Sequence, residues 1–122
     1  MSINPLASVG YEILKVALDA TSLRHQAISS NIANSNTENY QPLHVSFEEQ
    51  LQQEISGSGA ALKNDIAARV APRIEIDPDG TTVVIDQEMV RLNQNFIHHQ
   101  ALLKALNGKL ELASLAINEG KR

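Results

Sequence analysis

The chain has 122 residues and a formal net charge of −4, and aromatic residues make up only 3% of it. Its length fits one domain, but the large rings that dominate most cores and ligand pockets are scarce. The acidic balance and the lack of a basic cluster argue against nucleic acid as a partner. Because there is no cysteine, disulfides and thiolate metal sites are excluded. The composition favours packed helices over an enzyme with a pocket.

The N-terminal third predicts one long helix, from about residue 6 to residue 34. Pro5 suits its first turn, where a missing N–H costs nothing. Apolar or small residues recur in steps of three and four, at Leu6, Val9, Ile13, Val16, Ala20, Leu23, Ala27 and Ser30. A second apolar stripe, which includes Leu14 and Leu18, predicts more than one packing partner. An asparagine-rich stretch then ends the helix, because Asn tolerates the left-handed conformation.

The middle segment, residues 41–82, predicts small and partly irregular structure. Residues 47–55 fit a short helix, and Ser56 to Ala60 form a flexible Gly/Ser linker. Residues 73–76 and 82–85 read as two strands joined by a turn at residues 77–80, that is, as a β-hairpin. We therefore divide the chain into an N-terminal assembly helix with its asparagine-rich end (1–40), this middle segment (41–82) and a C-terminal assembly helix (83–122).

The C-terminal segment carries the strongest periodicity in the sequence. From residue 85 onward, steps of four and three alternate without a break, which defines a heptad seam. Its members are Ile85, Met89, Leu92, Phe96, His99, Leu103, Leu106, Leu110, Ala113 and Ile117. We expect a mainly α fold in which the two terminal helices pair as a coiled-coil-like hairpin. Surplus apolar residues, including Leu112 and Leu115, predict further partners from neighbouring subunits.

The residues whose types occur in metal or catalytic sites have simpler explanations. His98 and His99 are adjacent on a helix and point about 100° apart, so they cannot bind one metal together. The turn at residues 77–80 lacks the ligand pattern of a calcium loop. Glu48, Glu49 and Glu54 fit a solvated helix face better than a pair of catalytic acids. The sequence therefore predicts no catalytic residue, no cofactor, no metal and no small-molecule substrate.

The asparagine-rich stretch resembles a known family signature. Residues 30–41 read Ser-Asn-Ile-Ala-Asn-Ser-Asn-Thr-Glu-Asn-Tyr-Gln. This is similar to the N-terminal signature of the flagellar rod, hook and hook-associated axial proteins, which is Asn-Asn-Ile-Ala-Asn, two residues, Thr, one residue, Gly and Tyr. The matching positions are Asn31, Ile32, Ala33, Asn34, Thr37 and Tyr40. Asn39 replaces the usual Gly and is the next-best residue for a left-handed turn.

Within this family the chain is most similar to the proximal rod proteins of the B type. Its length leaves no room for a large middle domain, and residues 40–51, 84–89, 95–102 and 106–120 resemble that subgroup, which often has Tyr where this chain has His99. A C-type rod protein and a small helical export chaperone or adaptor are the alternatives. A chaperone has no need of the asparagine-rich motif.

The resemblance implies a structural subunit of the bacterial flagellar basal body. Such a subunit is exported through the flagellar type III apparatus without a cleaved signal, and residues 1–6 lack the basic and apolar regions of a secretory signal. It assembles in the periplasmic proximal rod with copies of itself, other rod proteins, and inner-membrane ring and export-gate components, and the rod transmits torque. The amides of Asn31 and Asn34 are expected either to reach an adjacent subunit or only to end the helix.

Overall fold

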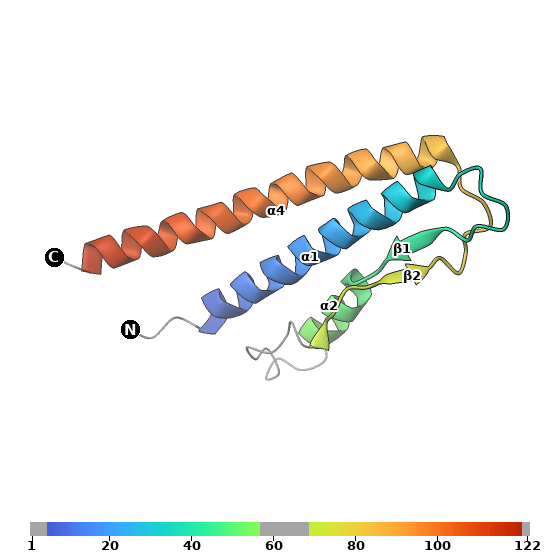
Figure 1. Cartoon of the computed structure of the whole chain (residues 1–122). Coiled ribbons are helices and arrows are strands. Elements are labelled where there is room, and N and C mark those ends of the chain that lie inside the picture. Colours follow the sequence, from blue (N-terminus) through green and yellow to red (C-terminus); the bar gives the residue numbers. More distant parts are fainter. Residues whose placement is uncertain (1–4, 57–68, 121–122) are drawn as a thin grey trace.

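Two long antiparallel helices dominate the molecule (Figure 1). A computed structural model describes residues 5–56 and 69–120. Helix α1 spans Pro5–Ala33 and helix α4 spans Ile85–Gly120. The start of α1 and the end of α4 lie at the same end of the molecule, where α4 extends beyond α1. The predicted mainly α fold with paired terminal helices is confirmed.

The asparagine-rich stretch ends α1 as expected. The last turn of α1 closes with a hydrogen bond from the Asn34 N–H to the Ser30 carbonyl, at 3.0 Å. Asn39 has a φ of 61°, so the left-handed turn expected from its place in the signature is confirmed. At the other boundary, Asp86 and Glu88 lie in the first turn of α4, where carboxylates stabilise the positive end of the helix dipole.

The middle segment contains a two-stranded antiparallel sheet, but its pairing differs from the predicted hairpin. Strand β1 (Leu43–Val45) pairs with strand β2 (Ile74–Ile76), with Leu43 opposite Ile76. The predicted partner of β2, residues 82–85, is not a strand, because Ile85 already begins α4. The turn does form, since the Gly80 N–H donates to the Asp77 carbonyl at 3.2 Å. After this turn the chain continues into α4. Strand β1, which packs against α1, is the partner of β2 instead.

Helix α2 (Glu48–Ser56) follows β1 and confirms the predicted short helix. The Leu51 N–H donates to the Phe47 carbonyl at 2.8 Å, which closes its first turn. The predicted Gly/Ser linker falls on residues 57–60 beyond Ser56, outside the described residues.

The hydrophobic core lies between α1 and the middle segment rather than between the two long helices. Its buried apolar side chains are Val16, Ala17, Ala20, Ala27, Ile28, Val45, Phe47 and Val70. No apolar residue of α4 is among them, although Leu102 packs against the cluster. Small alanines on α1 permit close approach of neighbouring elements. None of the described helices has a stretch apolar and long enough to cross a membrane.

Candidate functional site

Asn31 joins three elements of the fold through its side-chain amide. Its Oδ1 accepts hydrogen bonds from the Leu43 N–H at 2.8 Å and the Tyr40 hydroxyl at 2.9 Å. Its Nδ2 donates to the Leu43 carbonyl at 2.9 Å and to Glu88 Oε2 at 3.3 Å. An amide offers two donors and two acceptor lone pairs, so all of them are used within the chain. Asn31 is 1% exposed and leaves no hydrogen-bonding group for a neighbouring subunit.

The register of the sheet explains why Leu43 needs this amide. The Asp77 N–H donates to the Pro42 carbonyl at 2.8 Å, so these two residues form a hydrogen-bonded pair one position before Leu43 and Ile76. Pairs alternate along an antiparallel ladder. The Leu43 N–H and C=O therefore point away from β2 and toward α1. Asn31 takes the place of a third strand for Leu43, and we call this arrangement the asparagine clasp.

The rest of the signature organises the loop that leads from α1 to β1. Asn34 Nδ2 donates to the Ser30 carbonyl at 2.8 Å, and Asn34 Oδ1 accepts from the Thr37 hydroxyl at 3.1 Å. The Tyr40 hydroxyl lies 3.0 Å from Ser30 Oγ. Ile32 is half-buried and Ala33 is exposed. The signature thus holds the end of the helix, the left-handed turn and the first strand as one unit.

The contact between α1 and α4 is lined by polar side chains. Thr21 and Asn31 on α1 and Glu88 and Asn95 on α4 are all buried. Asn95 Nδ2 donates to the Thr21 carbonyl at 2.8 Å. Thr21 Oγ1 lies 2.9 Å from the Leu18 carbonyl and 2.7 Å from His99 Nδ1. Because Thr21 has one hydroxyl proton, which it donates to Leu18, His99 Nδ1–H is the donor to Thr21.

The predicted heptad seam divides into two columns with different neighbours. The first column, Leu92, His99 and Leu106, is half-buried, whereas Ile85 and Ala113 at its ends are exposed. The second column consists of Met89, Phe96, Leu103, Leu110 and Ile117, and we call it the outer stripe. Met89 is 51% and Phe96 61% exposed, while Leu103 is half-buried. Helix α1 therefore covers the first column of the seam and leaves most of the outer stripe exposed. Glu88 and Asn95 form a polar column that flanks the first column on the side away from the outer stripe.

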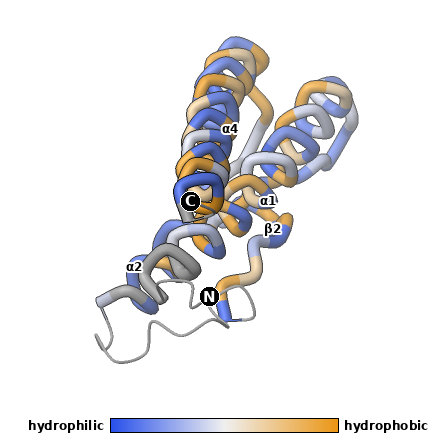
Figure 2. Tube along the Cα trace, turned by 90° about the vertical axis from the view of Figure 1, so that its left-hand side faces the viewer, coloured by the Kyte–Doolittle hydropathy of each residue, from blue (hydrophilic) through white to orange (hydrophobic). Residues whose placement is uncertain are grey.

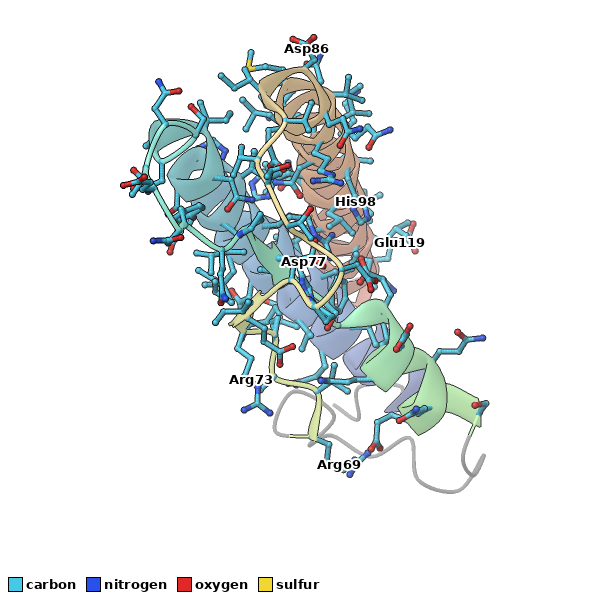
Figure 3. The ribbon with its side chains drawn as sticks, turned by 90° about the vertical axis from the view of Figure 1, so that its right-hand side faces the viewer. Arg69, Arg73, Asp77, Asp86, His98 and Glu119 are labelled. Atoms are coloured by element: carbon cyan, nitrogen blue, oxygen red, sulfur yellow. The ribbon has the colours of Figure 1, made fainter. Side chains whose placement is uncertain are left out.

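Apolar side chains are exposed along most of α4. Beyond the outer stripe they include Val90, Ile97, Leu112 and Leu115, and each is more than half exposed. Figure 2 shows hydrophobic positions along the whole helix, and Figure 3 shows side chains projecting around it from Asp86 at its start to Glu119 near its end. The large apolar surface of the described chain is thus concentrated on one helix.

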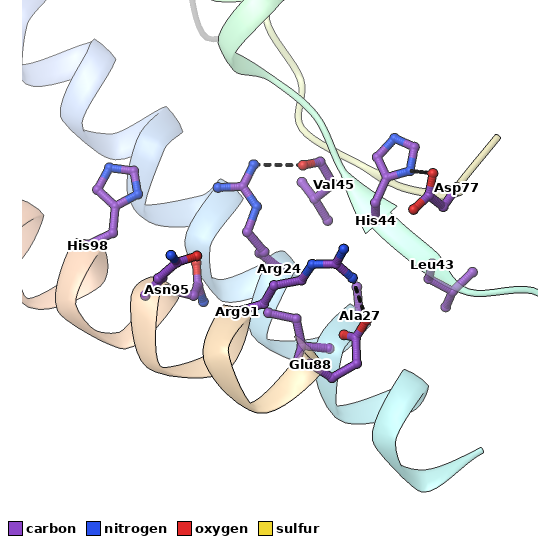
Figure 4. Close-up of a pocket in the computed structure, with 12 residues that line it drawn as sticks. Arg24, Ala27, Leu43, His44, Val45, Asp77, Glu88, Arg91, Asn95 and His98 are labelled. Atoms are coloured by element: carbon purple, nitrogen blue, oxygen red, sulfur yellow. Dashed lines mark hydrogen bonds and ion pairs between the residues drawn. The ribbon is translucent and has the colours of Figure 1, made fainter. Parts of the chain in front are cut away.

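A groove of about 480 Å³ lies between α4 and β1, with α1 as its floor (Figure 4). Its charged residues are mostly paired: Arg91 binds Glu88 at 2.6 Å, and Arg24 donates to the Val45 carbonyl at 2.6 Å. His44 Nδ1 and Asn95 Oδ1 line the groove and have no hydrogen-bond partner, although the former is 3.8 Å from Asp77 Oδ1. No nucleophile is paired with a base in this groove.

Arg24 also forms an ion pair with Glu48 at 2.9 Å, which ties α1 to the start of α2. Burial is the largest influence on the pKa of Glu48 and raises it. The backbone N–H groups of Glu48 and Phe47 and the Arg24 guanidinium together outweigh burial, so the pKa lies below its ordinary value.

Metal binding has no geometric support in the part of the chain that the structure describes, where no three metal-ligating side chains come together. His99 is occupied by Thr21, and His98 borders the groove. The clasp partners Leu43 and Glu88 were not foreseen from the sequence. Glu88 and Asn95 are seven residues apart and directly precede Met89 and Phe96 of the seam, and this spacing is the one signal in the sequence that could have revealed them.

Comparisons with known proteins point to one family. The family model described as "Flagella basal body rod protein" matches residues 14–41, which include the whole asparagine clasp except Leu43 and Glu88. The chain is 32% identical over 120 residues to the flagellar basal body rod protein FlgB of Bacillus subtilis (strain 168), covering 88% of this chain and 92% of that protein. It is 29% identical to FlgB of Yersinia ruckeri over 85% of this chain and 90% of the relative, and 29% identical to FlgB of Aeromonas hydrophila over 82% and 86%. The chain belongs to the flagellar basal body rod proteins.

Proposed function

We propose that this chain is a B-type subunit of the proximal rod, and that it assembles with copies of itself and with other rod proteins through the outer stripe of α4. Its role is structural and not enzymatic. The relatives above all bear the B-type name, which favours this subgroup over the C type and over an export chaperone.

The observation that carries the proposal is the half-covered heptad seam. A heptad repeat specifies a helix partner along its whole length. In this chain α1 lies beside the first column only, and Met89 and Phe96 in the outer stripe are mostly exposed. A soluble monomer gains nothing from large apolar side chains in this pattern. A helix of a neighbouring subunit would complete the seam.

A second groove marks where such a helix can lie. It has a volume of about 630 Å³ and runs between α1 and α4. Leu92 and Phe96 supply its apolar surface, and Ser22, His25 and Gln26 of α1 supply its polar edge. This combination of an apolar centre and a polar rim is typical of protein interfaces.

The family resemblance extends the proposal to place and mechanism. The subunit is exported without a cleaved signal and works in the periplasmic part of the basal body, next to inner-membrane ring and export-gate components. Helices packed on several sides would give the rod the stiffness it needs to transmit torque.

The test uses exposed seam residues, because their substitution spares the monomer. In a host strain that lacks its own copy of the gene, Met89→Asp with Phe96→Asp is expected to abolish swimming and rod formation while export of the subunit continues. Helix content of the purified chain should be unchanged, since both side chains already face water. A charge placed in a packed interface costs several kcal/mol.

The matched control is Gln87→Asp with Gln94→Asp, which adds the same two charges with the same spacing at two other exposed positions of α4. It should swim like the parent. Normal swimming by the variant at Met89 and Phe96 would overturn the outer stripe as an assembly surface, and equal loss in both variants would mean that added charge on α4 is itself harmful.

A further inference from the structure

The polar contacts between α1 and α4 suggest a role in specifying how the two helices align. Four buried polar side chains lie on these helices, Thr21, Asn31, Glu88 and Asn95. The hydrogen bonds between the two helices fall at two places. Asn95 and His99 of α4 bond to Thr21, and Glu88 of α4 accepts a hydrogen bond from Asn31. We propose that this polar ladder fixes the axial register of the helical hairpin, and that apolar packing alone does not.

Apolar packing is a weak guide to register in this hairpin because the facing surfaces repeat. Helix α4 presents Leu92 and Leu106 two heptads apart, with Leu102 nearby. Helix α1 presents Ala20 and Ala27 one heptad apart. If α4 slid by seven residues toward its C-terminus, the places of Leu92, His99 and Leu106 would be taken by Ile85, Leu92 and His99. The column would again present two aliphatic side chains and one histidine to the same small residues. The apolar contacts of the two registers would therefore be similar.

The ladder distinguishes these registers because its partners do not repeat. A slide of seven residues would place either Leu102 or Glu88 where Asn95 now meets Thr21. Neither reproduces the bond from Asn95 Nδ2 to the Thr21 carbonyl, and His99 would also lose the Thr21 hydroxyl. Buried polar groups would be left unpaired in every shifted register. Single buried polar residues set register in the same way in coiled coils.

His99 has a special place in this scheme. It lies between Leu92 and Leu106 at heptad spacing in the first column. His99→Leu would turn that column into an uninterrupted run of leucines, and so would remove the one first-column side chain that bonds across the interface in the paired stretch described. The inference concerns the chain itself and holds whether or not the outer stripe binds other subunits.

Distance measurement by double electron–electron resonance tests the proposal. The chain has no cysteine, so Ser29→Cys and Lys104→Cys place spin labels at two exposed sites, which lie roughly 20 Å apart along the axis in the observed register. The labelled parent should give one narrow distance distribution. The labelled variant with Thr21→Val, Asn95→Leu and His99→Leu should add populations displaced by about 10 Å along the axis, which is one heptad.

Two further variants make the outcome decisive. Leu106→Ala weakens apolar packing but keeps the ladder, so it should retain the single distance of the parent. Thr21→Val alone is a mild change that preserves side-chain shape, and it should already add a minor displaced population. It takes the place of the triple variant in the test if the triple variant does not fold. The proposal is overturned if the triple variant, or Thr21→Val in its place, keeps the single narrow distance. It is also overturned if the parent itself gives several distances, or if Leu106→Ala shifts the register as much as loss of the ladder.

Discussion

Replacing Asn31 by leucine tests the asparagine clasp directly, because leucine keeps the size of the side chain and removes the amide. Four groups lose a partner: the Leu43 N–H, the Leu43 carbonyl, the Tyr40 hydroxyl and Glu88. Two of them keep another, since Tyr40 still reaches Ser30 and Glu88 still binds Arg91. The loss therefore concentrates on the backbone of Leu43.

The size of the effect follows from those two backbone groups. A buried donor or acceptor left unpaired costs about 1–3 kcal/mol. The Leu43 N–H and C=O face α1 rather than β2, so β2 cannot replace the amide. We expect Asn31→Leu to lower the free energy of unfolding by about 3 kcal/mol, a large share of the roughly 5–15 kcal/mol typical of a domain.

Urea unfolding followed by circular dichroism measures this loss. With a denaturant slope of about 1–3 kcal/mol/M, the midpoint should fall by between about 1 and 3 M. Hydrogen exchange should locate the damage, because the Leu43 amide should exchange much faster in the variant. Asn34→Leu is the matched control: Asn34 bonds only within its own turn, to Ser30 and Thr37, and should cost about 1 kcal/mol or less. Equal losses in the two variants, or a Leu43 amide as protected as in the parent, would refute the clasp.

Three smaller changes test other parts of the fold. Tyr40→Phe removes the hydroxyl that contacts Asn31 and Ser30 and should lower the free energy of unfolding by about 1 kcal/mol in urea melts; no change would mean that water replaces it. Asn39 has a φ of 61°, so Asn39→Gly should leave the melting temperature equal or higher, whereas Asn39→Val should lower it through a strain of about 1–2 kcal/mol; similar melting of both would argue against the left-handed turn. The depressed pKa of Glu48 adds stability that is present above its unfolded pKa and lost as pH falls through its folded pKa. Glu48→Gln should therefore be less stable than the parent at neutral pH by less than about 1 kcal/mol, because the pair is partly exposed, and the difference should vanish in acid; a constant difference would contradict this account.

The sequence was sufficient to predict the long helices and the end of α1, because these depend on strong local signals. Heptad spacing extends over many turns, and the asparagines that end α1 act through their own backbone. The pairing of β1 with β2 was missed, because strands as short as Leu43–Val45 carry too little alternation to reveal a partner. The buried positions of Glu88 and Asn95 were also missed, since charged and amide side chains at one heptad spacing resemble a solvated face until the groups that pair with them are known.

The distribution of side chains on α4 connects the fold with the proposed role. Its polar residues Glu88 and Asn95 face α1, while nine large apolar residues between Ile85 and Ile117 are exposed. Full burial of such a side chain contributes about 1.5–3 kcal/mol, so covering the exposed half of each would contribute about 1 kcal/mol. Summed over the helix, this approaches the roughly 5–15 kcal/mol that stabilises a typical domain. A chain built this way would fold with modest stability and a defined register on its own, and would gain most of its stability when neighbouring helices cover α4.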